Sequence, residues 1–203
     1  MFGPEVLSVV RALPVPAIIY IAGPTCAGKT TLAKWLSDRL NSNVIIPMDN
    51  YYFDYDDPSL PRSNQYPTFD TPEAYHLKEL EGHLWQLKNG EDVDIPTYDI
   101  ATNSRLPNKE RISSAHDYYL IEGLYAFSLR PPGYKIFVTA SQETRRNRRL
   151  TRDRANLPTS ISIGRIESHF WHVERTTDDL ILPQQSQADL IIQSELQKGD
   201  EVR

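Results

Sequence analysis

Residues 17–30 read AIIYIAGPTCAGKT, an apolar run followed by a glycine-rich turn and the start of a helical pattern. The run Ala17 to Ala22 predicts a buried strand. The helical pattern that follows places four apolar residues on one face, namely Leu32, Ala33, Leu36 and Leu40. A strand, a tight turn and a helix in this order make half of a βαβ unit. The stretch therefore predicts an α/β fold with a parallel sheet.

The turn within this stretch matches the phosphate-binding pattern G-x-x-x-x-G-K-[ST] at every fixed position. In such a loop, backbone N–H groups and the following helix N-terminus converge on phosphate oxygens, and Lys29 reaches the β and γ phosphates. The hydroxyl of Thr30 is then a ligand for Mg²⁺. An ordinary glycine turn that caps a helix is the alternative, which the strand–turn–helix context disfavours. The expected nucleotide-binding residues are Gly23, Thr25, Cys26, Ala27, Gly28, Lys29, Thr30 and Thr31.

Four further apolar runs predict strands at 44–46, 118–121, 136–138 and 190–192, and five short strands suit one open sheet. A long segment at about 50–117 separates the second strand from the third. Within it, Thr71 and Pro72 predict a helix start, a leucine stripe follows, and Gly90 predicts its end. Residues 93–98 predict an extended arm outside the main sheet, because Pro96 cannot donate to a central ladder.

The composition limits where the protein can bind anions. The 203 residues include 22 Lys and Arg against 27 Asp and Glu, a formal net charge of −5. A surface that coats nucleic acid or anionic lipid is therefore not expected, and any anion site is local. One cysteine, Cys26, allows no intrachain disulfide, which is typical of a reducing compartment. The N-terminus does not resemble a secretory signal and no apolar stretch spans a membrane, so we expect a cytoplasmic protein.

Two acidic residues follow predicted strands. Glu122 ends the third strand, where a second Mg²⁺-ordering carboxylate is placed in phosphate-transferring proteins, and Asp49 follows the second strand. In open α/β sheets ligands bind at the carboxyl ends of the strands, so Lys29, Asp49 and Glu122 are expected to converge on one crevice. Asp49 is then a candidate base for an acceptor hydroxyl.

Six arginines lie between Arg145 and Arg154 on a predicted helix after the fourth strand. Helical spacing places Arg145, Arg149 and Arg152 on one face, which in an acidic protein is a local site for polyanions. A solvated surface or an RNA-binding patch is the alternative, but phosphoryl transfer requires arginines against developing charge. His169 and His172 have a spacing that metal sites use, yet no third ligand accompanies them, and packing or surface exposure is the favoured interpretation.

These motifs together resemble the uridine kinases (uridine–cytidine kinases) of the phosphoribulokinase and uridine kinase group of P-loop kinases. The resemblance covers nearly the whole chain. Besides the phosphate-binding loop, it includes DNYY at 49–52, FDTPEAY at 69–75, IPTYD at 95–99, SR at 104–105, IEG at 121–123 and RD at 152–153. LP at 182–183 and ADLII at 188–192 complete the series.

The resemblance implies a P-loop NTPase fold with a five-stranded parallel sheet flanked by helices, in a single domain over 1–203. The segment at about 50–117 would cap the substrate, and an Arg-rich lid would cover about 145–163. ATP (or GTP) and Mg²⁺ would be bound, and a nucleoside or another small hydroxyl-bearing substrate would accept the phosphoryl group. The family often forms oligomers, so a homo-oligomer is among the expectations.

By the same resemblance, Asp49 would be the general base on the 5′-hydroxyl, and Asp70 and Arg149 would hold the ribose hydroxyls. Arg152 would contact the phosphates. Tyr52, Phe69 and Tyr98 would enclose the base and sugar, because aromatic faces with a few polar groups suit an uncharged substrate.

The chain departs from the family at positions that would recognise the base. Asn103 stands where the family usually has a histidine, Ser168 stands where it has a glutamine, and residues 155–158 replace an Arg-Gly-Arg-Asp stretch. Three interpretations therefore stay open: a uridine or cytidine kinase, a kinase of another riboside or a small alcohol such as pantothenate or a sugar acid, and a nucleotide- or RNA-binding protein without useful turnover.

Overall fold

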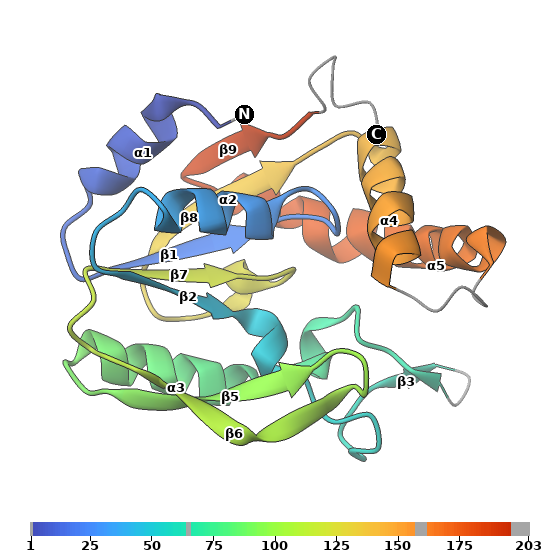
Figure 1. Ribbon diagram of the computed structural model, residues 1–203, viewed down its shortest axis with the longest axis horizontal. Coiled ribbons are helices and arrows are strands. Elements are labelled where there is room, and N and C mark those ends of the chain that lie inside the picture. Colours follow the sequence, from blue (N-terminus) through green and yellow to red (C-terminus); the bar gives the residue numbers. More distant parts are fainter. Residues whose placement is uncertain (1, 64–65, 157–161, 196–203) are drawn as a thin grey trace.

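A computed structural model describes residues 2–63, 66–156 and 162–195 (Figure 1). Its central sheet has five strands in the order β2-β7-β1-β8-β9, and every neighbouring pair is parallel. The strands are β1 (Ala17–Ala22), β2 (Asn43–Pro47), β7 (Tyr118–Glu122), β8 (Tyr134–Thr139) and β9 (Leu190–Gln193). All five lie where the apolar runs predicted them. The α/β class with one open parallel sheet is confirmed.

Alternating residues of the strands feed two separate cores on the two faces of the sheet. Ile19, Ile21 and Leu120 point to the face covered by α1 (Pro4–Arg11) and α2 (Lys29–Ser37). Tyr20 and Ile121 point to the opposite face, which packs against the segment between β2 and β7. This period of two is the expected consequence of the pleat of a strand. Burial on both faces explains why β1, at the centre of the sheet, is apolar along its whole length.

The segment between β2 and β7 forms a small layer of its own. It contains η1 (Met48–Tyr51), β3 (Arg62–Ser63), β4 (Tyr66–Pro67), η2 (Pro72–Ala74), α3 (Leu77–Lys88), β5 (Val93–Asp99) and β6 (Ser104–Ile112). β5 and β6 form an antiparallel hairpin outside the main sheet, as Pro96 predicted. In Figure 1 the hairpin and α3 lie below the central sheet.

The start of α3 differs from the sequence expectation. Thr71 precedes only the short 3₁₀ turn η2, and the α-helix begins five residues after Pro72, at Leu77. The interruption comes at Tyr75, which has an extended backbone and forms an isolated antiparallel bridge with Tyr52. Tertiary pairing thus overrides a local helix signal. The predicted end of the helix is correct, because Gly90 follows it with a φ of +82°.

Two helices follow β8 and carry the arginines. They are α4 (Gln142–Asn156) and α5 (Ile163–Thr176), and the chain returns to β9 through η4 (Thr177–Ile181) and η5 (Leu182–Gln187). Part of the expected lid, including the departures at Leu157 and Pro158, falls outside the described residues. Within the described ranges, no helix is long and apolar enough to cross a membrane.

Arg145 is not part of an anion-binding face. Its guanidinium forms a paired ion bridge with Glu174 of α5, in which both side chains are about 5% exposed or less. Glu174 also accepts a hydrogen bond from Gln142, and Arg146 pairs with Glu167 of the same α5 helix. These contacts, which we call the α4–α5 brace, fix the two helices against each other. The expectation that Arg145 joins Arg149 and Arg152 at phosphate is therefore wrong.

Candidate active site

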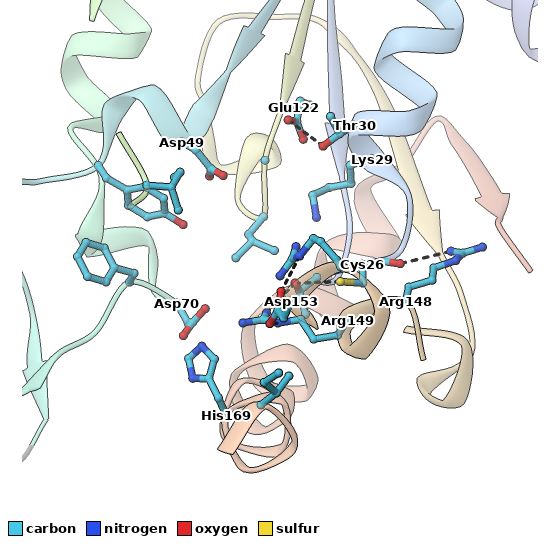
Figure 2. Close-up of a pocket in the computed structure, with 18 of the residues that line it drawn as sticks. Cys26, Lys29, Thr30, Asp49, Asp70, Glu122, Arg148, Arg149, Asp153 and His169 are labelled. Carbon is cyan, nitrogen blue, oxygen red and sulfur yellow. Dashed lines mark hydrogen bonds and ion pairs between the residues drawn. The ribbon is translucent and has the colours of Figure 1, made fainter. Parts of the chain in front are cut away.

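A cavity of about 1340 Å³ opens at the carboxyl ends of the parallel strands. The turn after β1, Asp49 of η1 and the end of β7 supply one wall, and α4 and α5 supply another (Figure 2). Most of the predicted site residues line it, namely Thr25, Cys26, Gly28, Lys29, Thr30, Thr31, Asp49, Tyr52, Phe69, Asp70, Asn103, Glu122, Arg149 and Arg152. The parallel topology brings these distant segments to one place, since β2, β7 and β1 are neighbours in the sheet.

The backbone of the turn requires glycine at two positions. Gly23 has a φ of +143°, and a Cβ there would lie 2.0 Å from the carbonyl oxygen of Val138. Gly28 has a φ of +107° and is the N-cap of α2, so it directs the N–H groups of the first helical turn into the cavity. Gly23 and Ala27, which were also expected to bind nucleotide, are buried in the turn and are not among the described residues that line the cavity.

The ammonium group of Lys29 lies inside this turn. Its Nζ donates hydrogen bonds to the carbonyl oxygens of Gly23 at 2.9 Å and Pro24 at 3.0 Å. Burial lowers the pKa of Lys29, and the nearby carboxylates of Glu122 and Asp49 oppose that shift. The cation is thus held next to the place where the backbone N–H groups converge.

Thr30 and Glu122 form the set of oxygen atoms that suits Mg²⁺. The Thr30 hydroxyl lies 3.1 Å from Oε1 of Glu122, as Figure 2 shows. A hydroxyl and a carboxylate are hard oxygen donors, and Mg²⁺ in phosphate-binding sites takes one or two such ligands together with phosphate oxygens. The residues present therefore fit this ion.

Asp49 occupies a buried position opposite Lys29. Burial and the neighbouring Glu122 raise the pKa of Asp49 to about 6, and the charge of Lys29 and hydrogen bonds from Tyr52 and Tyr75 oppose the increase. The hydroxyls of Tyr75 and Tyr52 are hydrogen-bonded to each other at 2.5 Å. A carboxylate with a pKa in this range is ionised at pH 7 and still accepts a proton, which is the requirement for a general base.

Arg149 and Arg152 share one carboxylate on α4. Asp153, which is 7% exposed, receives Nε of Arg149 at 2.5 Å and Nε of Arg152 at 2.9 Å. Nη1 of Arg149 also reaches the hydroxyl of Thr25 at 3.4 Å. The two guanidinium groups are thereby fixed beside the phosphate-binding turn.

Arg148 also reaches the turn, although its sequence position did not indicate a role. Its Nη1 donates to the carbonyl oxygens of Cys26 at 3.3 Å and Ala27 at 3.2 Å. Helical spacing alone could not show that Arg148 contacts the turn while Arg145 is buried, because the burial of Arg145 depends on where α5 packs. Asp153, His169 and His172 also line the cavity, and they are further residues to which no role was assigned.

The far end of the cavity is aromatic and acidic. The rings of Tyr52 and Phe69 meet edge to face at 5.3 Å, and the main-chain carbonyl of Asp70 accepts a hydrogen bond from Tyr125. Asn103 has a φ of +51° in the turn between β5 and β6, a conformation that asparagine tolerates better than most residues. The described residues that line the cavity do not include Tyr98, which packs behind Tyr52 and donates to the carbonyl of Phe53.

The model of the phosphoribulokinase / uridine kinase family matches residues 18–198. The chain belongs to this family. It is 35% identical over 183 residues to uridine-cytidine kinase B of Dictyostelium discoideum, a match that covers 87% of this chain and 74% of that protein. It is 34% identical over 182 residues to a uridine kinase of Chloroflexus aurantiacus, covering 87% of this chain and 86% of the relative.

The family relationship extends to the fold. A solved structure described as a possible uridine kinase from Bacillus stearothermophilus superposes with a TM-score of 0.65 at 18% identity, covering 93% of this chain and 96% of that one. The chain spans only 37% to 39% of the length of the relatives from Arabidopsis thaliana that it also matches.

Proposed function

We propose that the protein transfers the γ-phosphoryl group of ATP to the 5′-hydroxyl of a nucleoside, with uridine and cytidine as the first candidates. One observation carries the proposal: a phosphate-binding turn and a raised-pKa carboxylate, Asp49, face the same cavity, which ends in an aromatic and acidic pocket. Relatives named uridine kinase or uridine-cytidine kinase support the choice of acceptor.

The turn after β1 and the first turn of α2 bind the phosphates through their N–H groups. Lys29 is proposed to leave the carbonyls of Gly23 and Pro24 for the β and γ phosphates when nucleotide is present. Arg152, fixed by Asp153, neutralises charge that develops on the transferred group, and Arg149, held by the same carboxylate, donates to the hydroxyls of the acceptor sugar.

Thr30 and Glu122 would hold Mg²⁺. When bound at these two residues, the ion would supply charge neutralisation for phosphoryl transfer.

At the acceptor end, Tyr52 and Phe69 provide faces for an uncharged substrate. Asp49 accepts the proton of the attacking hydroxyl as the new O–P bond forms and the bond to the β-phosphate oxygen breaks, and ADP leaves. The order of events needs no covalent enzyme intermediate.

A panel of acceptors tests the proposal. Purified protein with ATP or GTP and Mg²⁺ is assayed for nucleoside diphosphate release with uridine, cytidine, purine ribosides, pantothenate and sugar acids. We expect acceptor-dependent release with a pyrimidine riboside. Release with only a different riboside or a small alcohol would move the assignment to that acceptor, which the departures at Asn103 and Ser168 make the second candidate.

No release with any acceptor would refute the kinase assignment. Salt-sensitive RNA binding without turnover would then favour a binding protein.

A further inference from the structure

His169 enters the acceptor end of the cavity from the opposite wall to Asp70. Figure 2 shows its ring on α5 turned toward the Asp70 carboxylate, and both residues line the cavity. The buried stripe of α5 consists of other residues, Ile166, Phe170 and Val173. His169 is exposed to the cavity and lies off this stripe, so core packing does not account for its position.

The groups around His169 make a mixed set of donors and acceptors. Burial raises the pKa of Asp70, and the charge of Arg149, together with that of His169 and His172 when these are protonated, opposes the shift. Desolvation by the cavity walls, together with Arg149, lowers the pKa of His169; His172 acts in the same direction, and Asp70 and Asp153 oppose it. At neutral pH the imidazole is therefore uncharged, with one N–H donor and one acceptor nitrogen.

We propose that His169 joins the Asp70 and Arg149 contacts already expected at the sugar hydroxyls and makes the recognition of the vicinal diol selective for ribosides over deoxyribosides. Each hydroxyl of a diol both donates and accepts. An ionised Asp70 can only accept hydrogen bonds and Arg149 can only donate them, whereas a neutral imidazole has one N–H donor and one acceptor nitrogen. His169 thus supplies the hydrogen-bonding capacity that the other two groups lack.

The α4–α5 brace fixes this residue relative to the phosphate-binding groups. The ion pairs Arg145–Glu174 and Arg146–Glu167 join the helix that carries Arg149 to the helix that carries His169. The sugar contact is consequently held in a defined position, which selection by hydrogen bonding requires.

The inference rests on the proposed function, and its test compares kcat/KM for uridine, 2′-deoxyuridine and 3′-deoxyuridine. The variants are His169→Phe, which keeps a ring and removes both nitrogens, and His169→Gln, which keeps a donor and an acceptor. His116→Phe is the matched control, because His116 lies against Tyr119 and is not among the described residues of the cavity. Melting temperatures check that each variant is folded.

For His169→Phe we expect kcat/KM with uridine to fall about tenfold, which is the size of effect for one lost hydrogen bond. With at least one deoxy analogue, which lacks a hydroxyl for that bond, kcat/KM should fall less than about threefold. The KM for ATP should not change. His169→Gln should keep a preference for uridine over the deoxy analogues, and His116→Phe should behave as wild type.

Three results for His169→Phe would overturn the inference while leaving the kinase assignment intact. The first is an equal loss of kcat/KM with all three acceptors, and the second is no loss of kcat/KM with uridine. The third is a change only in the preference between uridine and cytidine, which would place His169 at the base. A wild-type protein that phosphorylates no acceptor at all would instead remove the proposed function on which the inference rests.

Discussion

Replacing Asp49 with asparagine removes a proton acceptor while keeping the shape of the side chain and an oxygen toward Tyr52 and Tyr75. We expect kcat to fall strongly and the affinity for ATP to stay within about twofold, because a general base acts on the acceptor and not on the nucleotide. Burial raises the pKa of Asp49 to about 6, so the side chain is mostly ionised at pH 7.5, which is the pH chosen for the assay.

The size of the loss follows from the kind of reaction. General bases contribute roughly 10²- to 10⁴-fold to enzymatic rates. Phosphoryl transfer has a loose transition state in which positioning and charge neutralisation dominate, and that favours the lower end of this range. A loss of about 10²-fold corresponds to about 2.7 kcal/mol of transition-state stabilisation.

The assay measures steady-state ADP release at saturating acceptor, and ATP affinity is measured separately by calorimetry. Asp56→Asn is the matched control, because Asp56 is an exposed residue of the same segment that does not line the cavity, and it should keep wild-type kcat. If Asp49→Asn kept kcat within about threefold of wild type, or weakened ATP binding as strongly as it slowed turnover, Asp49 could not be the base.

Four further outcomes are expected. The wild-type kcat should fall as the pH drops below about 6 and level off above 7, because only ionised Asp49 accepts a proton; a flat profile from pH 5 to 8 contradicts this. Glu122→Gln should raise the Mg²⁺ concentration needed for half-maximal activity by about tenfold, measured by Mg²⁺ titration. Glu174→Gln should lower the free energy of unfolding by about 3 kcal/mol, since it leaves Arg145 buried without its counter-ion; denaturant unfolding checks this. Gly23→Ala should abolish the stabilisation of the protein by ATP in thermal melts, because its Cβ would collide with the carbonyl of Val138.

Much of the sheet could be predicted because its evidence is local. Each of the five strands contains a short apolar run, and in the central strands β1, β7 and β8 burial on both faces of the sheet demands that composition. The convergence of Lys29, Asp49 and Glu122 on one cavity could be predicted because ligands bind at the carboxyl ends of the strands in open parallel sheets, and the sequence shows where each strand ends. The roles of these residues stay predictions.

The remaining features depend on tertiary contacts that no local pattern encodes. The start of α3 was misplaced because the bridge between Tyr52 and Tyr75 holds the chain extended beyond Pro72. Arg145 and Arg148 are one helical turn apart on α4, and the position of Glu174 on α5 decides that Arg145 is the one that is buried in an ion pair. His169 could not be assigned to the cavity because its approach to Asp70 is a tertiary contact between α5 and the connection from β4 to η2.

The division of the cavity between two parts of the fold has a consequence for engineering. Lys29, Asp49 and Glu122 follow strands of the rigid sheet, whereas Asn103 and His169 come from a hairpin turn and from a helix outside it. A library restricted to that turn and to the exposed face of α5 would therefore vary the proposed acceptor end of the cavity and leave Lys29, Asp49 and Glu122 unchanged.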